Sequence, residues 1–334
     1  MAVLRLDRRR SNSVFRSRAF GLRVEADRPV PGLAEGSFAG EADVRIHFTV
    51  PAPSSRGEVT TIQDAADATA TNRFVTVTRA GDVIRFDYRD ATSFAIDASG
   101  DNVWVAWPDD LTIEDATTYL LGPVFGYVLR LRGIVSLHAS CVTIDGGAVA
   151  FIGDAGAGKS TITAAFALAG REVITDDVLT LRRGHGGRLD AVPSYARVRL
   201  WSATVEALFG AAEALPRIVP THPDWDKRYL PLDGPLFATE TRPLRLLYVL
   251  QRREGAPETL PMQSRDSLVA LIANSYVNYL LDAAMRRTEF ELLSDAIRSV
   301  PVRSANTGAS FSDLPRFREL VECDVAALAN GSVT

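Results

Sequence analysis

One short run of residues constrains this chain more than any other part of its sequence. Residues 153–160 read Gly-Asp-Ala-Gly-Ala-Gly-Lys-Ser and match the pattern G-x-x-x-x-G-K-[ST] throughout. An apolar, strand-like segment (148–152) precedes the run, and a helix-like segment (161–169) follows it. In this context, glycines let consecutive backbone N–H groups point at a polyphosphate, and the helix N-terminus adds partial positive charge. The run therefore predicts a nucleoside triphosphate site rather than a plain glycine-rich turn.

The same pattern assigns roles to individual residues. Lys159 is expected to reach the β- and γ-phosphates, and the Ser160 hydroxyl is expected to hold Mg²⁺. ATP and Mg²⁺ are the predicted cofactors, although no motif separates ATP from GTP. The candidate cofactor-binding residues of the loop are Gly153, Asp154, Ala155, Gly156, Ala157, Gly158, Lys159, Ser160 and Thr161.

Composition narrows the class of protein. The 334 residues are 46% hydrophobic and 23% charged, as in ordinary globular proteins of one or two domains. A formal net charge of −4 argues against general nucleic-acid binding. The two cysteines are far apart and form no Cys/His cluster, which argues against a zinc site or a disulfide scaffold, and Cys141 is expected to be buried. No secretory signal or membrane span is recognisable, so we expect a cytoplasmic protein without a membrane partner.

The patterning divides the chain into three parts. Residues 1–14 form a basic, mobile terminus. Residues 15–132 are β-rich, with short alternating segments that predict an antiparallel sheet with one wet face, and they end in a connector helix over 112–132. Residues 133–334 alternate strands and helices, which predicts an α/β nucleotide-binding domain.

Within the last part, the elements can be placed approximately. We expect strands at 134–144, 148–152, 172–175 and 244–250, and a pair formed by 178–182 and 188–192. Helices are expected at 201–209, 264–284 and 289–298, with a Pro-rich polar stretch at 216–235. The apolar surfaces of the helices within 264–298 make a homo-oligomer possible.

Two adjacent carboxylates, Asp176 and Asp177, close the strand that follows the loop helix. A right-handed crossover would return this strand beside the loop. Because successive side chains of an extended segment point to opposite faces, one aspartate is expected to hold metal near Ser160 while the other meets the acceptor. The alternative is a pair of solvated turn aspartates.

Three further residues are candidates on weaker grounds. His138 lies among apolar strand residues and is either a hydrogen-bonded core histidine or a catalytic one. Lys227 and Arg228 stand beside aromatic residues and close over phosphates, receive an acidic or peptide substrate, or belong to a solvated loop.

Together these residues resemble the catalytic core of the HPr kinase/phosphorylase family. The similar runs are Leu137-His138-Ala139-Ser140, the loop 153–160, and Ile174-Thr175-Asp176-Asp177, within about 134–195. The resemblance implies a kinase domain of the phosphoenolpyruvate carboxykinase type. It also implies that His138 and the aspartates surround the transferred phosphate, one aspartate as base and the other near Mg²⁺.

The chain also departs from that family. The glycine-rich segment that follows the aspartates in HPr kinases is replaced by residues 193–201, and the N-terminal half is unlike their regulatory domain. The layout is more similar to the lasso peptide kinases, which phosphorylate the C-terminal serine of a precursor peptide. That resemblance implies that the β-rich half helps to hold the peptide.

These observations lead to a main hypothesis and two alternatives. The main one is an ATP- and Mg²⁺-dependent serine kinase in which Asp177 accepts the hydroxyl proton with help from His138 and Asp176 holds the metal; the two aspartates can exchange roles. The catalytic candidates are Asp177, Asp176, His138 and Lys159. The alternatives are a kinase of a small molecule or of an HPr-type carrier protein, and a nucleotide-binding scaffold without catalysis.

Overall fold

The computed structural model of the chain describes residues 4–5, 14–54, 56–64, 74–219, 221, 225–251 and 253–331. It is a mixed α/β structure with several sheets, as the sequence predicted. The chain forms two compact units. The N-terminal unit contains Met1–Ile134, Val219–Asp224 and Tyr279–Met285, and the C-terminal unit contains Val135–Ile218, Trp225–Asn278 and Arg286–Thr334.

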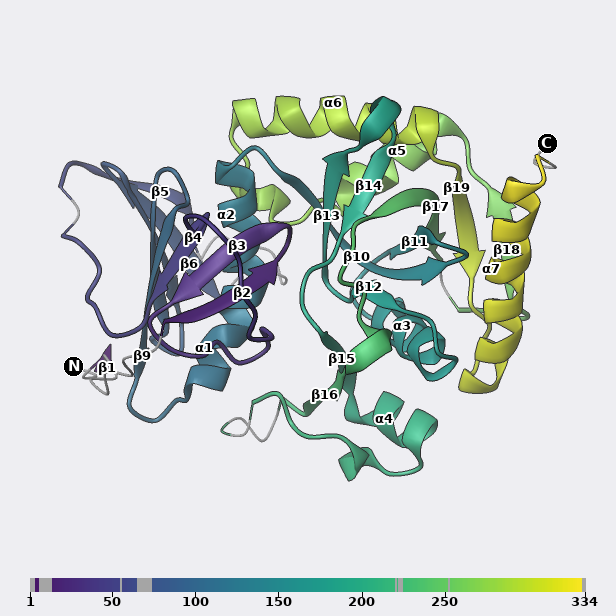
Figure 1. Ribbon diagram of the computed structural model, residues 1–334, viewed down its shortest axis with the longest axis horizontal. Helices are drawn as coiled ribbons and strands as arrows, with labels where there is room; N and C mark the ends of the chain where they lie inside the picture. Colours follow the sequence, from purple (N-terminus) through teal and green to yellow (C-terminus); the bar gives the residue numbers. More distant parts are fainter. Residues whose placement is uncertain are drawn as a thin grey trace. The chain divides into compact units, whose positions relative to one another are not determined.

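The N-terminal unit is built on one sheet of nine strands (Figure 1). Alternate residues of β2 and β3 are buried, which gives the sheet one covered face, as the alternating sequence pattern predicted. The strands are β1 (Leu4–Arg5), β2 (Phe15–Ala19), β3 (Leu22–Ala26), β4 (Val44–His47), β5 (Val59–Gln63), β6 (Val75–Ala80), β7 (Val83–Tyr88), β8 (Ser93–Asp97) and β9 (Asn102–Pro108).

The expectation of a purely antiparallel sheet was wrong. Strand β4 lies parallel to both of its neighbours, β3 and β9. Parallel neighbours need a long return connection, and residues 27–43 supply one between β3 and β4. Alternation identifies which face of a strand is buried, but it does not identify the partner strand.

The connector expected at 112–132 is helical but kinked. It consists of α1 (Ile113–Tyr119), the π-helical η1 (Leu120–Val124) and α2 (Phe125–Leu131), with non-helical dihedral angles at Gly122 before Pro123. Thr112 and Asp115 form a capping box at its start. Phe125 stacks on Phe20 with ring centroids 5.0 Å apart, so α2 packs on the sheet of its own unit.

The C-terminal unit is a sheet of eight strands with helices on both faces. Strands β11, β17 and β19 are parallel, and β10 runs antiparallel to β11. The strands are β10 (Val135–Ile144), β11 (Gly147–Ile152), β12 (Val173–Thr175), β13 (Val178–Arg183), β14 (Leu189–Val192), β17 (Arg242–Leu250), β18 (Glu258–Pro261) and β19 (Val302–Asn306).

Two apolar clusters fill this unit. One lies between the sheet and helices α5 (Ser264–Ala273) and α6 (Ala283–Ser299), and includes Leu137, Leu271 and Leu293. The other lies between the opposite face and helices α3 (Lys159–Leu168) and α7 (Leu314–Ala329), and includes Phe151 and Phe317 (Figure 1). Strands buried on both faces explain why β11 is continuously apolar.

The remaining elements of this unit are short. Strands β15 (Arg197–Trp201) and β16 (Lys227–Pro231) form a separate two-stranded sheet, and helix α4 (Ser202–Phe209) follows β15. The 3₁₀ turns are η2 (His185–Gly187), η3 (Ala212–Ala214), η4 (Gly234–Leu236) and η6 (Phe311–Asp313); a further one, η5 (Asn278–Leu280), straddles the boundary between the units.

Most predicted elements of this unit are present, with three differences. The Pro-rich stretch 216–235 contains strand β16. The helix expected at 264–284 ends at Ala273, and α6 begins at Ala283 instead of 289. Helix α7 and strands β15, β18 and β19 were not predicted from the sequence.

The two cysteines are free thiols, and Cys141 is buried as predicted. Among the residues that the structure describes, no helix is long and apolar enough to cross a membrane.

Candidate active site

The phosphate-loop pattern lies between the end of β11 and the start of α3. Gly158 precedes the helix with a φ of 102°, a left-handed conformation that favours glycine. Gly153 opens the loop with a φ of 152°, and a Cβ there would lie 3.1 Å from the Cβ of Leu250. The Lys159 ammonium curls back over the loop and donates to the carbonyl oxygens of Gly153 and Asp154, at 2.5 and 3.2 Å. The two glycines and the Lys159 hydrogen bonds thus fix a tight turn of the backbone before α3.

A cavity of about 520 Å³ opens over the loop. It gathers most of the candidate residues: His138, Ala155, Gly156, Gly158, Lys159, Ser160, Thr161, Asp176, Asp177 and Lys227. Gly153, Asp154, Ala157 and Arg228 are not among its lining residues. Residues that the sequence analysis did not single out also line it, among them Arg199, Trp201, Thr204, Arg253 and Phe311.

Asp176 and Asp177 lie in the turn between β12 and β13, and both line this cavity. Their carboxylates meet different partners, Asp176 near Ser160 and Asp177 beside His138. The turn is held by the Thr175 hydroxyl, which donates to the carbonyl oxygen of Val178 at 3.1 Å. Both carboxylates are buried, which argues against a pair of solvated turn aspartates.

Asp176 is the more weakly paired of the two carboxylates. Its Oδ2 accepts the backbone N–H of Arg199 at 2.8 Å, whereas its buried Oδ1 has no hydrogen-bond partner within the described part of the chain. Burial raises the pKa of Asp176 to about 7, although Arg199 and the nearby Ser160 hydroxyl oppose this shift. A buried carboxylate oxygen without a partner is available to a cation.

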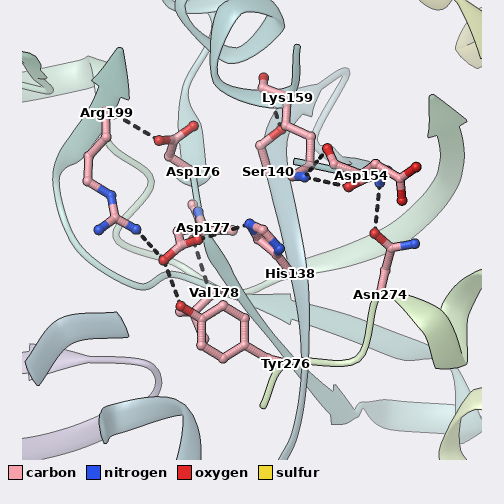
Figure 2. Close-up of polar contacts among 12 residues, drawn as sticks. His138, Ser140, Asp154, Lys159, Asp176, Asp177, Val178, Arg199, Asn274 and Tyr276 are labelled. Atoms are coloured by element: carbon pink, nitrogen blue, oxygen red, sulfur yellow. Dashed lines mark hydrogen bonds and ion pairs between the residues drawn. The ribbon is translucent and has the colours of Figure 1, made fainter. Parts of the chain in front are cut away.

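Asp177 is paired on both of its oxygens (Figure 2). Oδ1 lies 3.3 Å from Nε2 of His138, and Oδ2 accepts the hydroxyl of Tyr276 at 2.9 Å and the guanidinium of Arg199. Burial alone would raise the pKa of Asp177, but Arg199 and the hydrogen bonds from His138 and Tyr276 hold it well below its usual range. This carboxylate is therefore ionised at neutral pH.

His138 is not enclosed in the core. It projects from β10, its side chain is 43% exposed, and its ring meets the Tyr276 ring edge-on at 5.7 Å. The Asp177 carboxylate orients the imidazole, whose exposed side faces the cavity. A hydrogen-bonded core histidine would not have this exposure.

The cavity carries more positive than negative charge. Lys159, Arg199, Lys227 and Arg253 line it against two carboxylates. Burial lowers the pKa of Lys227, and repulsion from Arg199 lowers it further. The Lys227 ammonium lies 4.8 Å from the ring centre of Trp201 and 5.8 Å from that of Trp225. An anionic ligand would relieve this repulsion.

Arg228 does not join Lys227 at the cavity. Its guanidinium donates to Asp226 at 2.8 Å and to the carbonyl oxygen of Leu215 at 3.0 Å. Neighbouring residues of a strand point to opposite faces, and Lys227 and Arg228 are neighbours in β16. Of the two cations predicted to close over phosphates, only Lys227 lines the cavity.

The residues present fit a magnesium ion. The Asp176 carboxylate and the Ser160 hydroxyl are oxygen donors of the type that Mg²⁺ prefers. Among the described residues, no cluster of three or more His, Cys, Asp or Glu side chains could hold a metal by itself. Two protein oxygens are sufficient for Mg²⁺, because it retains waters and binds phosphate oxygens at nucleotide sites.

No protein-family model and no curated protein matches this chain. Among solved structures, it is similar to the Hpr(Ser) kinase/phosphatase of Coxiella burnetii, with a TM-score of 0.30 and 14% sequence identity. The match covers 59% of this chain and 93% of that one. A similarity of this size assigns no activity, so a functional proposal depends on the residues of the cavity.

Proposed function

We propose that this chain is an ATP- and Mg²⁺-dependent kinase that transfers the γ-phosphoryl group to a serine hydroxyl. One observation carries the proposal: two buried carboxylates with different partners share a cationic cavity with a complete phosphate loop. A nucleotide-binding scaffold needs the loop and the cations, but it has no need of a second buried carboxylate beside an oriented histidine.

Nucleotide binding rests on the loop and the cations. The loop amides and the N-terminus of α3 favour the phosphates, and Lys159 exchanges its carbonyl partners for phosphate oxygens. Ser160 and Asp176 would hold the metal ion. When bound, Mg²⁺ would neutralise charge on the β- and γ-phosphates.

Transfer depends on the second carboxylate. The serine oxygen forms a bond to the γ-phosphorus, the bond from that phosphorus to the β,γ-bridging oxygen breaks, and ADP leaves. The hydroxyl proton passes to the Asp177–His138 pair, whose two side chains are already linked. The pKa of Asp177 is low for a base, but phosphoryl transfer has a loose transition state in most analyses, and positioning contributes more than basicity.

The acceptor that we propose is the C-terminal serine of a ribosomally made precursor peptide. Support comes from the resemblance of the His138, 153–160 and Asp176-Asp177 runs to HPr-kinase-like proteins, and of the layout to lasso peptide kinases. Because His138 is half-exposed, the Asp177–His138 pair is accessible from the cavity. The serine hydroxyl of another molecule needs such access to reach this pair.

The test is intact-mass spectrometry of a precursor peptide ending in serine after incubation with the protein and Mg-ATP. We expect the peptide to gain one phosphate mass, and Asp177→Asn to abolish the gain while nucleotide binding persists. Asp190→Asn is the matched control, because Asp190 is also buried but lies in β14, outside the cavity. Transfer to free serine or to an HPr-type protein, without transfer to the peptide, would contradict the acceptor. Nucleotide binding without transfer to any hydroxyl would contradict the kinase.

A further inference from the structure

The residues after α5 lie along β10 as an added strand. The N–H of His138 donates to the carbonyl oxygen of Asn274 at 2.7 Å, and the N–H of Tyr276 donates to that of Ser136 at 2.9 Å. Leu137 and Ser275 form an antiparallel bridge between these two hydrogen bonds. Residues 274–276 are therefore fixed by the backbone against the strand that carries His138.

Asn274 faces the phosphate loop. Its side-chain oxygen accepts the N–H of Gly153 at 3.0 Å, and its side-chain nitrogen donates to the carbonyl oxygen of Ala270 at 2.9 Å. The bond to Ala270 fixes the orientation of the amide, so the oxygen points at the loop. Gly153 in turn presents its carbonyl oxygen to Lys159. Asn274 is thus connected through one residue to the lysine of the loop.

Tyr276 faces the acceptor side of the same cavity. Its hydroxyl donates to Oδ2 of Asp177, and its ring packs edge-on against His138 (Figure 2). Burial raises the pKa of Tyr276 well above its ordinary value, so the hydroxyl remains a donor at neutral pH. Tyr276 and Arg199 together hold the same carboxylate oxygen and leave Oδ1 to His138.

We infer that Asn274 and Tyr276 are two positioning residues of the proposed kinase, with separable tasks. Asn274 sets the start of the phosphate loop and so supports nucleotide binding. Tyr276 sets the Asp177–His138 pair and so supports transfer. This inference rests on the proposed function for the transfer step, whereas the part on nucleotide binding stands by itself.

The experiment compares Asn274→Ala and Tyr276→Phe with the wild-type protein. We expect Asn274→Ala to raise the Kd for Mg-ATP about tenfold, equivalent to about 1.4 kcal/mol, with a smaller change in kcat. We expect Tyr276→Phe to lower kcat about tenfold or more, with an unchanged Kd for Mg-ATP. A general loss of structure would change both the Kd and kcat in each variant, instead of the Kd in one and kcat in the other.

Two control variants make similar losses outside the cavity. Tyr248→Phe removes a tyrosine hydroxyl that donates to Asp324 at 2.7 Å, and Gln263→Ala shortens an exposed side chain at the start of α5. Neither control is expected to change the Kd or kcat. The inference is overturned if Asn274→Ala leaves the Kd unchanged, if Tyr276→Phe leaves kcat unchanged, or if Tyr248→Phe raises the Kd and lowers kcat as much as these two variants do.

Two readings on the folded protein need no transfer. In the wild-type protein, the Gly153 amide is expected to exchange its hydrogen more slowly than the Gly156 amide, which has no partner among the described residues. Equal rates overturn the role of Asn274, even if its variant does not fold. The ¹⁵N shifts of the His138 ring report the tautomer that Asp177 holds, and they are expected to change in Tyr276→Phe. If the wild-type protein binds Mg-ATP but transfers nothing, the proposed function fails, and these shifts and the Kd still decide the inference.

Discussion

An ion pair of the N-terminal unit and the charged side chains of the cavity differ in their exposure to solvent. In the N-terminal unit, Arg23 and Asp43 form an ion pair at 2.7 Å with side chains 34% and 23% exposed. In the C-terminal unit, Lys159, Asp176 and Asp177 are buried around one cavity. Arg23 lies in β3, where strand alternation sends polar residues to the solvated face, and Asp43 immediately precedes β4.

The buried charges around the cavity carry an energetic cost. Removing charges from water costs several kcal/mol per ion, and an ion pair recovers this only with good geometry and further hydrogen bonds. Asp177 has such partners, whereas Asp176 has one oxygen without a hydrogen bond among the described residues. The difference teaches that an exposed ion pair is solvated whatever it binds, whereas the incompletely paired charges of the cavity are those to which the proposed function assigns a ligand.

Arg199→Met is expected to give the largest effect. It removes the guanidinium from Asp177 and leaves a buried carboxylate less compensated, which costs about 3 kcal/mol of the free energy of unfolding. Urea unfolding measures this loss, and phosphate transfer is expected to disappear with it. Arg23→Met in the N-terminal unit is the matched control, and its ion pair is more exposed. Equal effects of the two substitutions would break the comparison.

Lys159→Met is expected to weaken Mg-ATP binding about a hundredfold, because a charge-assisted contact to phosphate is lost. Removal of a buried cation also lowers the desolvation cost, so the unfolding temperature is expected to hold or rise. Calorimetric titration with Mg-ATP and a thermal scan measure the two quantities. An unchanged Kd would contradict the assignment of the loop.

The parts of the site that follow from the sequence are those that depend on contiguous residues. The loop 153–160 is fixed by its own glycines and by the strand and helix beside it, so the pattern was sufficient to predict its place. Asp176 and Asp177 follow one strand later, and their approach to the loop follows from the connection. That both carboxylates reach one cavity did not follow, because the turn after Thr175 is held by hydrogen bonds and not by strand periodicity.

The parts that did not follow come from distant segments. Asn274 and Tyr276 lie in an apolar run that has the periodicity of a helix, and the sequence predicted helix there. Backbone hydrogen bonds to Ser136 and His138 end the helix instead, so tertiary contacts override the local preference. Arg199 lies on β15, whose pairing with β16 joins two segments that are nearly thirty residues apart. No local signal in the sequence marks such a pairing. For the same reason, the sequence did not show that Lys227 and Arg228 lie on opposite faces of a strand.

Lys227 allows a smaller and pH-dependent test of the comparison. Its lowered pKa means that the ammonium of the free protein loses its proton at a lower pH than an ordinary lysine does. Phosphate favours the ammonium, so Mg-ATP binding takes up protons in this range, and affinity falls as the pH rises through the lowered pKa. Lys227→Arg is expected to remove this dependence, since guanidinium remains charged. Lys227→Ala is expected to weaken binding about tenfold below the lowered pKa and by less above it, because the neutral lysine of the wild-type protein contributes less.

The smallest expected effect is that of Asp43→Asn in the N-terminal unit, and it concerns the pH dependence of stability. The hydrogen bond from Arg23 lowers the pKa of Asp43 to about 2, so the ionised carboxylate stabilises the folded state. This contribution is complete above the unfolded pKa of about 3.9 and is lost as the pH falls toward 2. The wild-type protein is therefore expected to lose slightly more stability than Asp43→Asn between pH 4 and 2. Thermal scans of both proteins across this range measure the difference. At pH 7 the substitution is expected to leave the Kd for Mg-ATP unchanged, because Asp43 precedes β4 and does not line the cavity. A changed Kd would show that the two sets of charges are coupled.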